Sequence, residues 1–272
     1  MRGASRASLS AAKERLAAAL DGATAAQASE VGDQLFAVVN LLDQETGLRR
    51  SLSDSSRERA ARTGLAEALL AGKISDTALD QVTELVAARW SEPGDLADAA
   101  EELAVIAIAE AADKEGQLDE LEDELFRFSR IVQANAGLRS ALSNQFVPAA
   151  ARAGLVSELV QGKVSGQALR LITQAAGYPR GRSLDTGLEA YANLAAELRE
   201  RLVAEVHVAV PLTREQRGRL AAALVAAYGR DVYLNVVVDP ELIGGITVRV
   251  GDELINGSVA SKLADLRRRM VA

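Results

Sequence analysis

The sequence lacks cysteine and contains a single histidine, His207. Without cysteine, the chain forms no disulfide, no thiolate zinc site and no cysteine nucleophile. One histidine also excludes a metal site built from several histidines, and its place between valines favours a half-buried structural role over a catalytic one. Aromatic residues are scarce, at nine of 272, so there are few platforms on which bases or sugars could stack.

Positive charge and long apolar segments are also lacking. The net charge is −7, which argues against nucleic-acid binding because that function needs a dominant basic face. No run of about 18 apolar residues is present, so we expect no membrane-spanning segment. Lys13, Glu14 and Arg15 interrupt the segment after the basic N-terminus, which argues against a signal peptide. A cytosolic protein, or one on the cytosolic side of a membrane, is predicted.

Alanine is the commonest residue, at 52 of 272. Because alanine is the best helix former, a mostly helical protein is predicted. Apolar residues make up 49% and charged residues 25%, which is ordinary for a globular chain. The length leaves room for about two domains.

An internal repeat appears when the chain is shifted by 90 residues. Residues 30–79 then match residues 120–169 at 20 of 50 positions without a gap. The matches include aligned glycines, arginines and a phenylalanine, which indicates a duplicated helical unit. Positions expected to keep a core role in both copies are Leu35, Phe36, Leu48, Leu52, Leu65, Leu69 and Leu79. The polar loop 55–58 replaces the more apolar loop 145–148, so we expect the two copies to have different partners.

Helical periodicity and turn signals predict three segments. These are an N-terminal helical bundle over 1–94, a second bundle over 95–203 and a C-terminal module over 204–272. A helix over about 95–112 could end the first bundle and also begin the second. In the second copy, helices are predicted to stop at Asn135, Gly162 and Gly177, and a long helix to run from 184 to 202.

Past residue 204 the apolar period changes from 3.6 to 2. Val206–Val210, Val232–Val238 and Ile246–Val250 read as strands. Thr213–Gln216 is a capping box that opens a helix between the first two strands. This order predicts a parallel pair joined by a crossover, with the third strand antiparallel. A last helix is expected after Ser258. The predicted fold is thus mainly α with a small α/β C-terminal domain.

No segment is predicted to form an active site. The stretch 244–251 has glycines but no Lys-Ser/Thr and no following helix, so a strand with glycines at its entry is favoured over a phosphate loop. The acidic run 119–124 is predicted to lie on the solvent face of a helix. Trp90 is predicted to fill the core. No cofactor and no metal are expected.

A hydrophobic strand near the C-terminus is followed by an acid, a Gly-Gly pair, a basic residue before Gly-Asp, and Ile-Asn-Gly-Ser. These motif residues are Asp239, Gly244, Gly245, Arg249, Gly251, Asp252, Asn256, Gly257 and Ser258. The pattern resembles the ATP synthase delta subunit family, the bacterial counterpart of the oligomycin-sensitivity-conferring protein. The family has aspartate where Asn256 stands. Residues from about 99 onward match a delta subunit in length and order, and the preceding residues resemble the extra bundle of enlarged, actinobacterial-type delta subunits.

The resemblance implies a non-catalytic stator subunit that joins the catalytic head to the peripheral stalk. It implies that the helical bundle binds the N-terminal helix of a head alpha subunit, and that the C-terminal module binds the stalk b subunit. Neither a nucleic acid nor direct insertion in the membrane is implied. The protein would lie at the cytoplasmic face of the cell membrane as part of the synthase.

The groove for the alpha helix is predicted on the first and fifth helices of the second bundle, at Val105, Ile106, Leu169 and Ile172. The N-terminal bundle is predicted to be an added brace along the stalk or the flank of the head. Two other classes stay open at this stage. One is a free-standing helical-repeat scaffold, and the other is an enzyme that binds a small phosphate ligand through 244–251.

Overall fold

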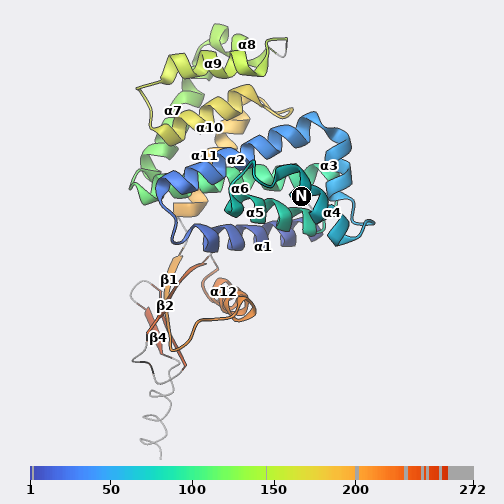
Figure 1. Cartoon of the computed structure of the whole chain (residues 1–272). Helices are drawn as coiled ribbons and strands as arrows, with labels where there is room; N and C mark the ends of the chain where they lie inside the picture. Colours follow the sequence, from blue (N-terminus) through green and yellow to red (C-terminus); the bar gives the residue numbers. More distant parts are fainter. Residues whose placement is uncertain are drawn as a thin grey trace, which may run out of the picture. The chain divides into compact units, whose positions relative to one another are not determined.

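The structure is a computed structural model of the chain. It describes residues 1, 3–144, 146–199, 202–229, 232–239, 242, 245–250 and 253–256. These residues contain twelve helices and four strands and divide into two compact units, Met1–Leu198 and Arg199–Ala272 (Figure 1). The first unit is helical and the second is α/β, so the predicted fold class is confirmed.

The helices of the first unit repeat along the chain as the 90-residue shift predicts. The second to fifth helices are α2 (Ala25–Gln44), α3 (Thr46–Ser53), α4 (Arg59–Leu70) and α5 (Asp76–Ala87). Their counterparts are α7 (Leu118–Ala134), α8 (Ala136–Ser143), α9 (Ala149–Val160) and α10 (Gly166–Gly177). A further helix recurs three times, as α1 (Gly3–Leu20), α6 (Pro93–Lys114) and α11 (Leu184–Arg199). Each copy is therefore a set of six helices, and α6 belongs to both sets.

Local signals fix these boundaries. Gly72 and Gly162 follow α4 and α9, and both have a φ of 73°, a left-handed conformation that glycine adopts without a steric penalty. The side chains of Ser75 and Ser165 then cap α5 and α10, because each accepts a hydrogen bond from the backbone N–H three residues further along the chain. The same stop and start signals, 90 residues apart, give the two copies the same helices.

Both copies share one hydrophobic core, and α6 runs through it. This helix contacts α1, α2, α3 and α5 of the first copy and α7 and α10 of the second. Figure 1 shows α2 lying along α6. Gly32 permits this approach, since a Cβ added there would lie 2.7 Å from the Ile108 side chain. Trp90 is buried, as predicted, and donates a hydrogen bond of 2.8 Å to the carbonyl of Leu85. Residues 1–94 and 95–203 thus lie largely within one compact unit.

The second unit is a four-stranded sheet with one described helix. The elements are β1 (Leu202–Val208), α12 (Arg214–Tyr228), β2 (Val232–Val238), β3 (Ile246–Val250) and β4 (Glu253–Asn256), and the strand order is β2-β1-β3-β4. Strands β1 and β2 are parallel and β1 and β3 antiparallel, which confirms the predicted topology. The capping box at Thr213 is also present.

Two boundaries differ from the sequence prediction. The long helix α11 ends at Arg199 and not at 202, because Leu202 already pairs with Val232 in the parallel ladder. Strand β1 correspondingly begins earlier and ends at Val208. The predicted last helix lies outside the described residues.

Candidate partner-binding site

Three of the four residues predicted to line the alpha groove belong to the core. Val105, Ile106 and Ile172 are buried on α6 and α10. Leu169 is half-buried and lies beside the core on α10. The role of these residues in partner binding stays a prediction, but in this conformation only Leu169 is accessible to another chain.

Leu169 lines an open groove between α2 and α10. The groove has a volume of about 580 Å³ and is lined by residues of both copies, among them Phe36, Asn40, Leu169, Gln174 and Tyr178. Arg170 and Asp33 form an ion pair of 3.0 Å at its edge. The amides of Asn40 and Gln174 also face each other, and Gln174 Nε2 donates to Asn40 Oδ1 at 3.1 Å. Both copies therefore contribute to the groove, and the sequence did not indicate that they meet here.

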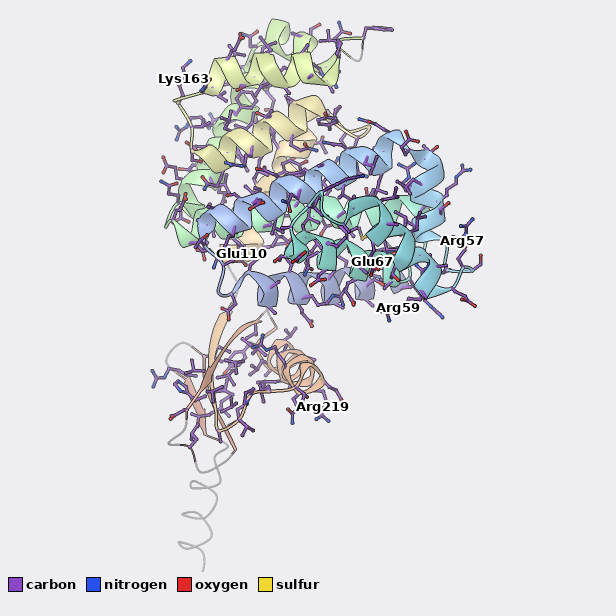
Figure 2. The ribbon with its side chains drawn as sticks, in the orientation of Figure 1. Arg57, Arg59, Glu67, Glu110, Lys163 and Arg219 are labelled. Carbon is purple, nitrogen blue, oxygen red and sulfur yellow. The ribbon has the colours of Figure 1, made fainter. Side chains whose placement is uncertain are left out.

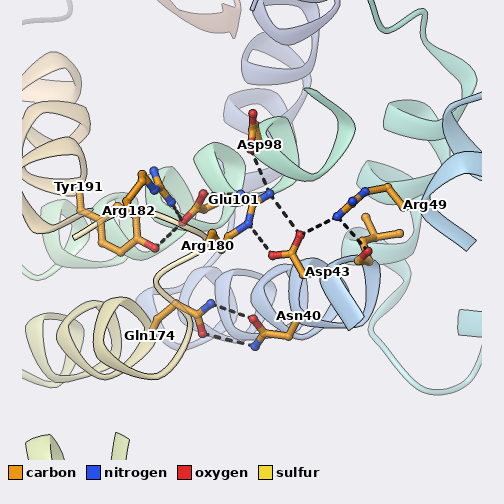
Figure 3. Close-up of polar contacts among 10 residues, drawn as sticks. Asn40, Asp43, Arg49, Asp98, Glu101, Gln174, Arg180, Arg182 and Tyr191 are labelled. Atoms are coloured by element: carbon orange, nitrogen blue, oxygen red, sulfur yellow. Dashed lines mark hydrogen bonds and ion pairs between the residues drawn. The ribbon is translucent and has the colours of Figure 1, made fainter. Parts of the chain in front are cut away.

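A buried polar network joins the copies beside this groove (Figure 3). Its centre is Glu101 of α6, which is only 3% exposed. The Tyr191 hydroxyl of α11 donates a hydrogen bond of 2.7 Å to the Glu101 carboxylate. Arg180 and Arg182 both form ion pairs with the same carboxylate. Arg180 also pairs with Asp43 of α2 at 2.6 Å. The loop between α10 and α11 is thereby tied to α6 and to the first copy.

The surroundings of Tyr191 and Arg180 determine the charge states of these two residues. Burial raises the pKa of the Tyr191 hydroxyl well above its ordinary value, and the nearby Glu101 carboxylate raises it further, so Tyr191 is neutral. Burial lowers the pKa of Arg180, but the carboxylates of Glu101, Asp43 and Asp98 more than offset this effect and raise it overall. Arg180 is thus a permanent cation held among acids. It also adopts a φ of 51°, which is uncommon for a residue with a side chain.

Sequence reasoning missed this network. The segment 178–183 reads as a loop by composition, and its arginines gave no sign of burial. The available signal was Glu101 itself, because an acid inside the apolar stretch of α6 requires a partner.

The acidic run 119–124 is not wholly on the solvent face. Glu124 is buried, and its carboxylate accepts hydrogen bonds from the backbone N–H and the hydroxyl of Ser165 at the start of α10. Gln34 occupies the equivalent position in the first copy and accepts the same two bonds from Ser75. The prediction for Glu124 is therefore wrong, and this residue acts as a helix-terminus acceptor.

The two copies also differ in their exposed apolar residues. Phe36 is 5% exposed, whereas its counterpart Phe126 is 59% exposed, so the expected core role holds only in the first copy. Phe146, in the loop before α9, is 98% exposed. Arg57 and Arg59 lie in and after the corresponding loop of the first copy (Figure 2). The divergence of this loop is thus a difference in surface chemistry.

The described residues of the family motif lie within or next to strands β2, β3 and β4. Gly245 has a φ of 88° just before β3, and Arg249 is exposed on that strand. The backbone N–H of Asp239 donates to the carbonyl of Val208 at 2.9 Å, and Asn256 pairs with Thr247 in the β3–β4 ladder. Gly244, Gly251, Asp252, Gly257 and Ser258 lie outside the described residues. Gly245 leads into a strand, as expected for a strand entry and not for a phosphate loop.

His207 is half-buried in β1, as predicted. Among the described residues, no three histidine, aspartate or glutamate side chains gather in a way that suits a metal ion. Within the same residues, no helix combines the length and apolar character needed to span a membrane.

Comparisons with known proteins agree with the motif. The family model of the ATP synthase delta (OSCP) subunit matches residues 105–270. The ATP synthase subunit delta of Streptomyces avermitilis is 50% identical over 99% of this chain and 98% of that protein. The proteins of the same description from Streptomyces coelicolor and Kineococcus radiotolerans are 48% and 45% identical, covering 100% and 98% of this chain and 99% and 97% of theirs.

A chain in the structure of the Toxoplasma gondii mitochondrial ATP synthase hexamer also matches, at 15% identity and a TM-score of 0.26. The match covers 62% of this chain and 95% of that one, and the score is too low to establish a common fold. The family model matches more than half of the chain and the relatives match nearly all of it, so the chain belongs to the ATP synthase delta (OSCP) subunit family.

Proposed function

We propose that this chain is the stator link that connects the catalytic head of the synthase to its peripheral stalk at the cytoplasmic face of the membrane. A delta (OSCP) subunit is a non-catalytic component of the synthase, associated peripherally with the membrane-bound complex. The observation that carries the proposal is the single core of residues 1–198. The two copies are tied together through α6 and the Glu101 network into one compact unit, an arrangement that suits a stator because a stator must resist torque.

The coupling of ATP hydrolysis to proton pumping tests this proposal. Membranes depleted of the chain should retain ATP hydrolysis by the head but lose ATP-driven proton pumping. Adding back the full chain should restore pumping. Undiminished pumping by depleted membranes would contradict a stator role.

We further propose that the segment 95–203 binds the N-terminal helix of an alpha subunit through the groove that contains Leu169. An amphipathic helix placed in an apolar groove is a common mode of recognition. The repeat supplies a matched control, because Leu79 holds the equivalent position in the first copy and is also half-buried.

The two leucines are exchanged for glutamate one at a time in the full chain, and binding of the alpha N-terminal peptide is measured. Leu169→Glu should weaken binding at least tenfold, and Leu79→Glu should leave it unchanged. The opposite result would assign the alpha subunit to the first copy.

The module 204–272 is proposed to bind the b subunit. Gly245 is the described motif residue with the strongest geometric constraint, since valine at a φ of 88° would be strained. Gly245→Val should weaken association with b while the helical unit stays folded. Gly218→Ala in α12 is the control, because the added Cβ would meet open space. Normal assembly of the Gly245→Val variant with b would count against this assignment.

The segment 1–94 is proposed to be a brace with a partner of its own. Arg57 is well exposed at the α3–α4 loop (Figure 2). Because the chain has no cysteine, Arg57→Cys gives a single labelling site. A crosslink from this site to b or to the flank of the head in assembled synthase would support the brace, and a crosslink to the alpha N-terminal helix would oppose it.

A further inference from the structure

The outer side of α7 is an exposed apolar surface with basic edges. We call it the α7 face, and it consists of Asp123, Phe126, Arg127, Arg130, Ile131 and Ala134, which line a hollow of about 460 Å³. Phe126 and Ile131 are 59% and 51% exposed. Two large apolar side chains so exposed on one helix suggest an interaction site.

The repeat indicates what kind of element covers such a face. Ninety residues earlier, Asp33, Phe36, Ala37 and Asn40 occupy the positions of Asp123, Phe126, Arg127 and Arg130. Those four residues line the groove formed with α10. Asp33 pairs with Arg170 of α10, and Phe36 lies beside Tyr191 of α11 with the ring centroids 6.2 Å apart. In the first copy, amphipathic helices of the following copy therefore cover this face.

The second copy has kept the apolar centre of the face and changed its charge. Arg127 and Arg130 replace Ala37 and Asn40, while Ile131 replaces Leu41. Both arginines are exposed, and neither pairs with an acid among the described residues. Cationic side chains beside an apolar stripe favour a partner with acidic groups at matching positions.

These charges argue against two occupants from the chain itself. Asp123 could pair with Arg170 of a second copy as Asp33 does, but α10 contains no acidic residue, so this contact would leave Arg127 and Arg130 without a counter-charge. The C-terminal Arg267, Arg268 and Arg269 have the same sign as Arg127 and Arg130. The two arginines that replace Ala37 and Asn40 thus favour binding of another polypeptide and disfavour end-to-end association of two copies of this chain.

We propose that the α7 face binds an amphipathic helix of another polypeptide, with an apolar stripe over Phe126 and Ile131 and acidic side chains opposite Arg127 and Arg130. The site is distinct from the α2–α10 groove proposed for the alpha helix. It gives the second copy a further protein contact through the surface that the first copy uses internally.

A peptide built on α10 tests the recognition chemistry. The probe is residues 163–179 carrying Thr173→Glu and Gln174→Glu, and the reference is the unchanged sequence. The acidic probe should bind the full chain at least tenfold more tightly than the reference, with an affinity that falls as salt is raised. Phe126→Ala and the double variant Arg127→Glu/Arg130→Glu should each reduce this binding at least tenfold.

Phe146→Ala is the control, because Phe146 is exposed elsewhere on the same copy. It should leave probe binding unchanged. Equal binding of both peptides, or unchanged binding to the Arg127→Glu/Arg130→Glu variant, would overturn the proposed acidic partner.

Crosslinking in assembled synthase tests the natural occupant. Because the wild-type chain lacks cysteine, Ile131→Cys places one photoactivatable label on the α7 face. An adduct with a helical segment of another subunit that carries acidic residues beside an apolar stripe supports the proposal. No adduct, or an adduct only with a second copy of this chain, overturns it.

Discussion

The helices α2–α5 and α7–α10 have the same lengths or nearly so, yet they play different parts in the unit. In the first copy, α2 is covered on one side by α6 and on another by α10. In the second copy, the equivalent face of α7 is exposed and carries two additional arginines. Duplication therefore preserved the local fold, while position in the assembled unit decided which faces became core and which became surface.

The largest expected effect concerns the junction between the copies. Glu101→Ala should lower the free energy of unfolding by about 3–5 kcal/mol, because Arg180 and Arg182 would lose their buried counter-charge. Thermal unfolding of the full chain measures this loss. Glu102→Gln is the matched control, since Glu102 forms a more exposed ion pair with Lys13, and its effect should be under about 1 kcal/mol. Similar effects for the two variants would show that the Glu101 network does not stabilise the junction.

A second effect compares the buried arginines of the two copies. Arg62 donates to the carbonyls of Val86, Ala87 and Ala88 at the end of α5. Arg152 makes the equivalent bonds to Ala176 and Gly177 and also reaches Asn144 and Val147. Each change to alanine should cost about 2–4 kcal/mol, with the larger loss at Arg152, because hydrogen bonds to a charged group are each worth about 1.5–3 kcal/mol.

Urea unfolding of the full chain measures both arginine variants. A larger loss at Arg62→Ala would contradict the expected order. It would indicate that the contacts of Arg152 before α9 add nothing to stability.

A third effect concerns the close approach of α2 to α6. Gly32→Ala should destabilise the chain by about 1–3 kcal/mol, since the new Cβ would lie 2.7 Å from Ile108 and 3.0 Å from the carbonyl oxygen of Ala104. The equivalent position in the second copy is Glu122, where the chain already accommodates a long side chain. Gly64→Ala in α4 is the control, because its added Cβ would meet open space, and it should not destabilise the chain since alanine is the better helix former. An unchanged melting temperature for Gly32→Ala would mean that the two helices separate at little cost.

The smallest expected effect is at the start of α10. Glu124→Gln should cost only about 0.5–1 kcal/mol, because Gln34 already holds Ser75 in the same way with a neutral amide. Glu124→Ala should cost more, since the N–H and hydroxyl of Ser165 would lose their acceptor. Thermal melts of both variants measure the difference. Equal losses would show that the charge of Glu124, and not its hydrogen bonds, stabilises α10.

The motif and the local elements could be read from the sequence, whereas the burial of the residues predicted to bind a partner could not. Gly162 and Ser165 identified the break before α10, and the alternating valines identified the strands. Three residues predicted to line the groove are buried, namely Val105, Ile106 and Ile172. The sequence did not indicate this burial, because periodicity marks an apolar face without indicating what covers it. The alternation and spacing of apolar residues are local properties of the sequence, whereas the burial of a face depends on distant parts of the chain.

The sequence by itself determined the duplicated helices, the β1–β2 pairing direction and the family, since caps, turns and motif residues act over a few positions. Only the tertiary structure decided that both copies share α6, that Glu101 and Glu124 are buried, and that Phe126 is exposed where Phe36 is not. Each of these outcomes depends on the contacts that distant parts of the chain do or do not make, such as Asp33 with Arg170 and Glu101 with Tyr191. Identical local patterns therefore acquire different roles according to what packs against them.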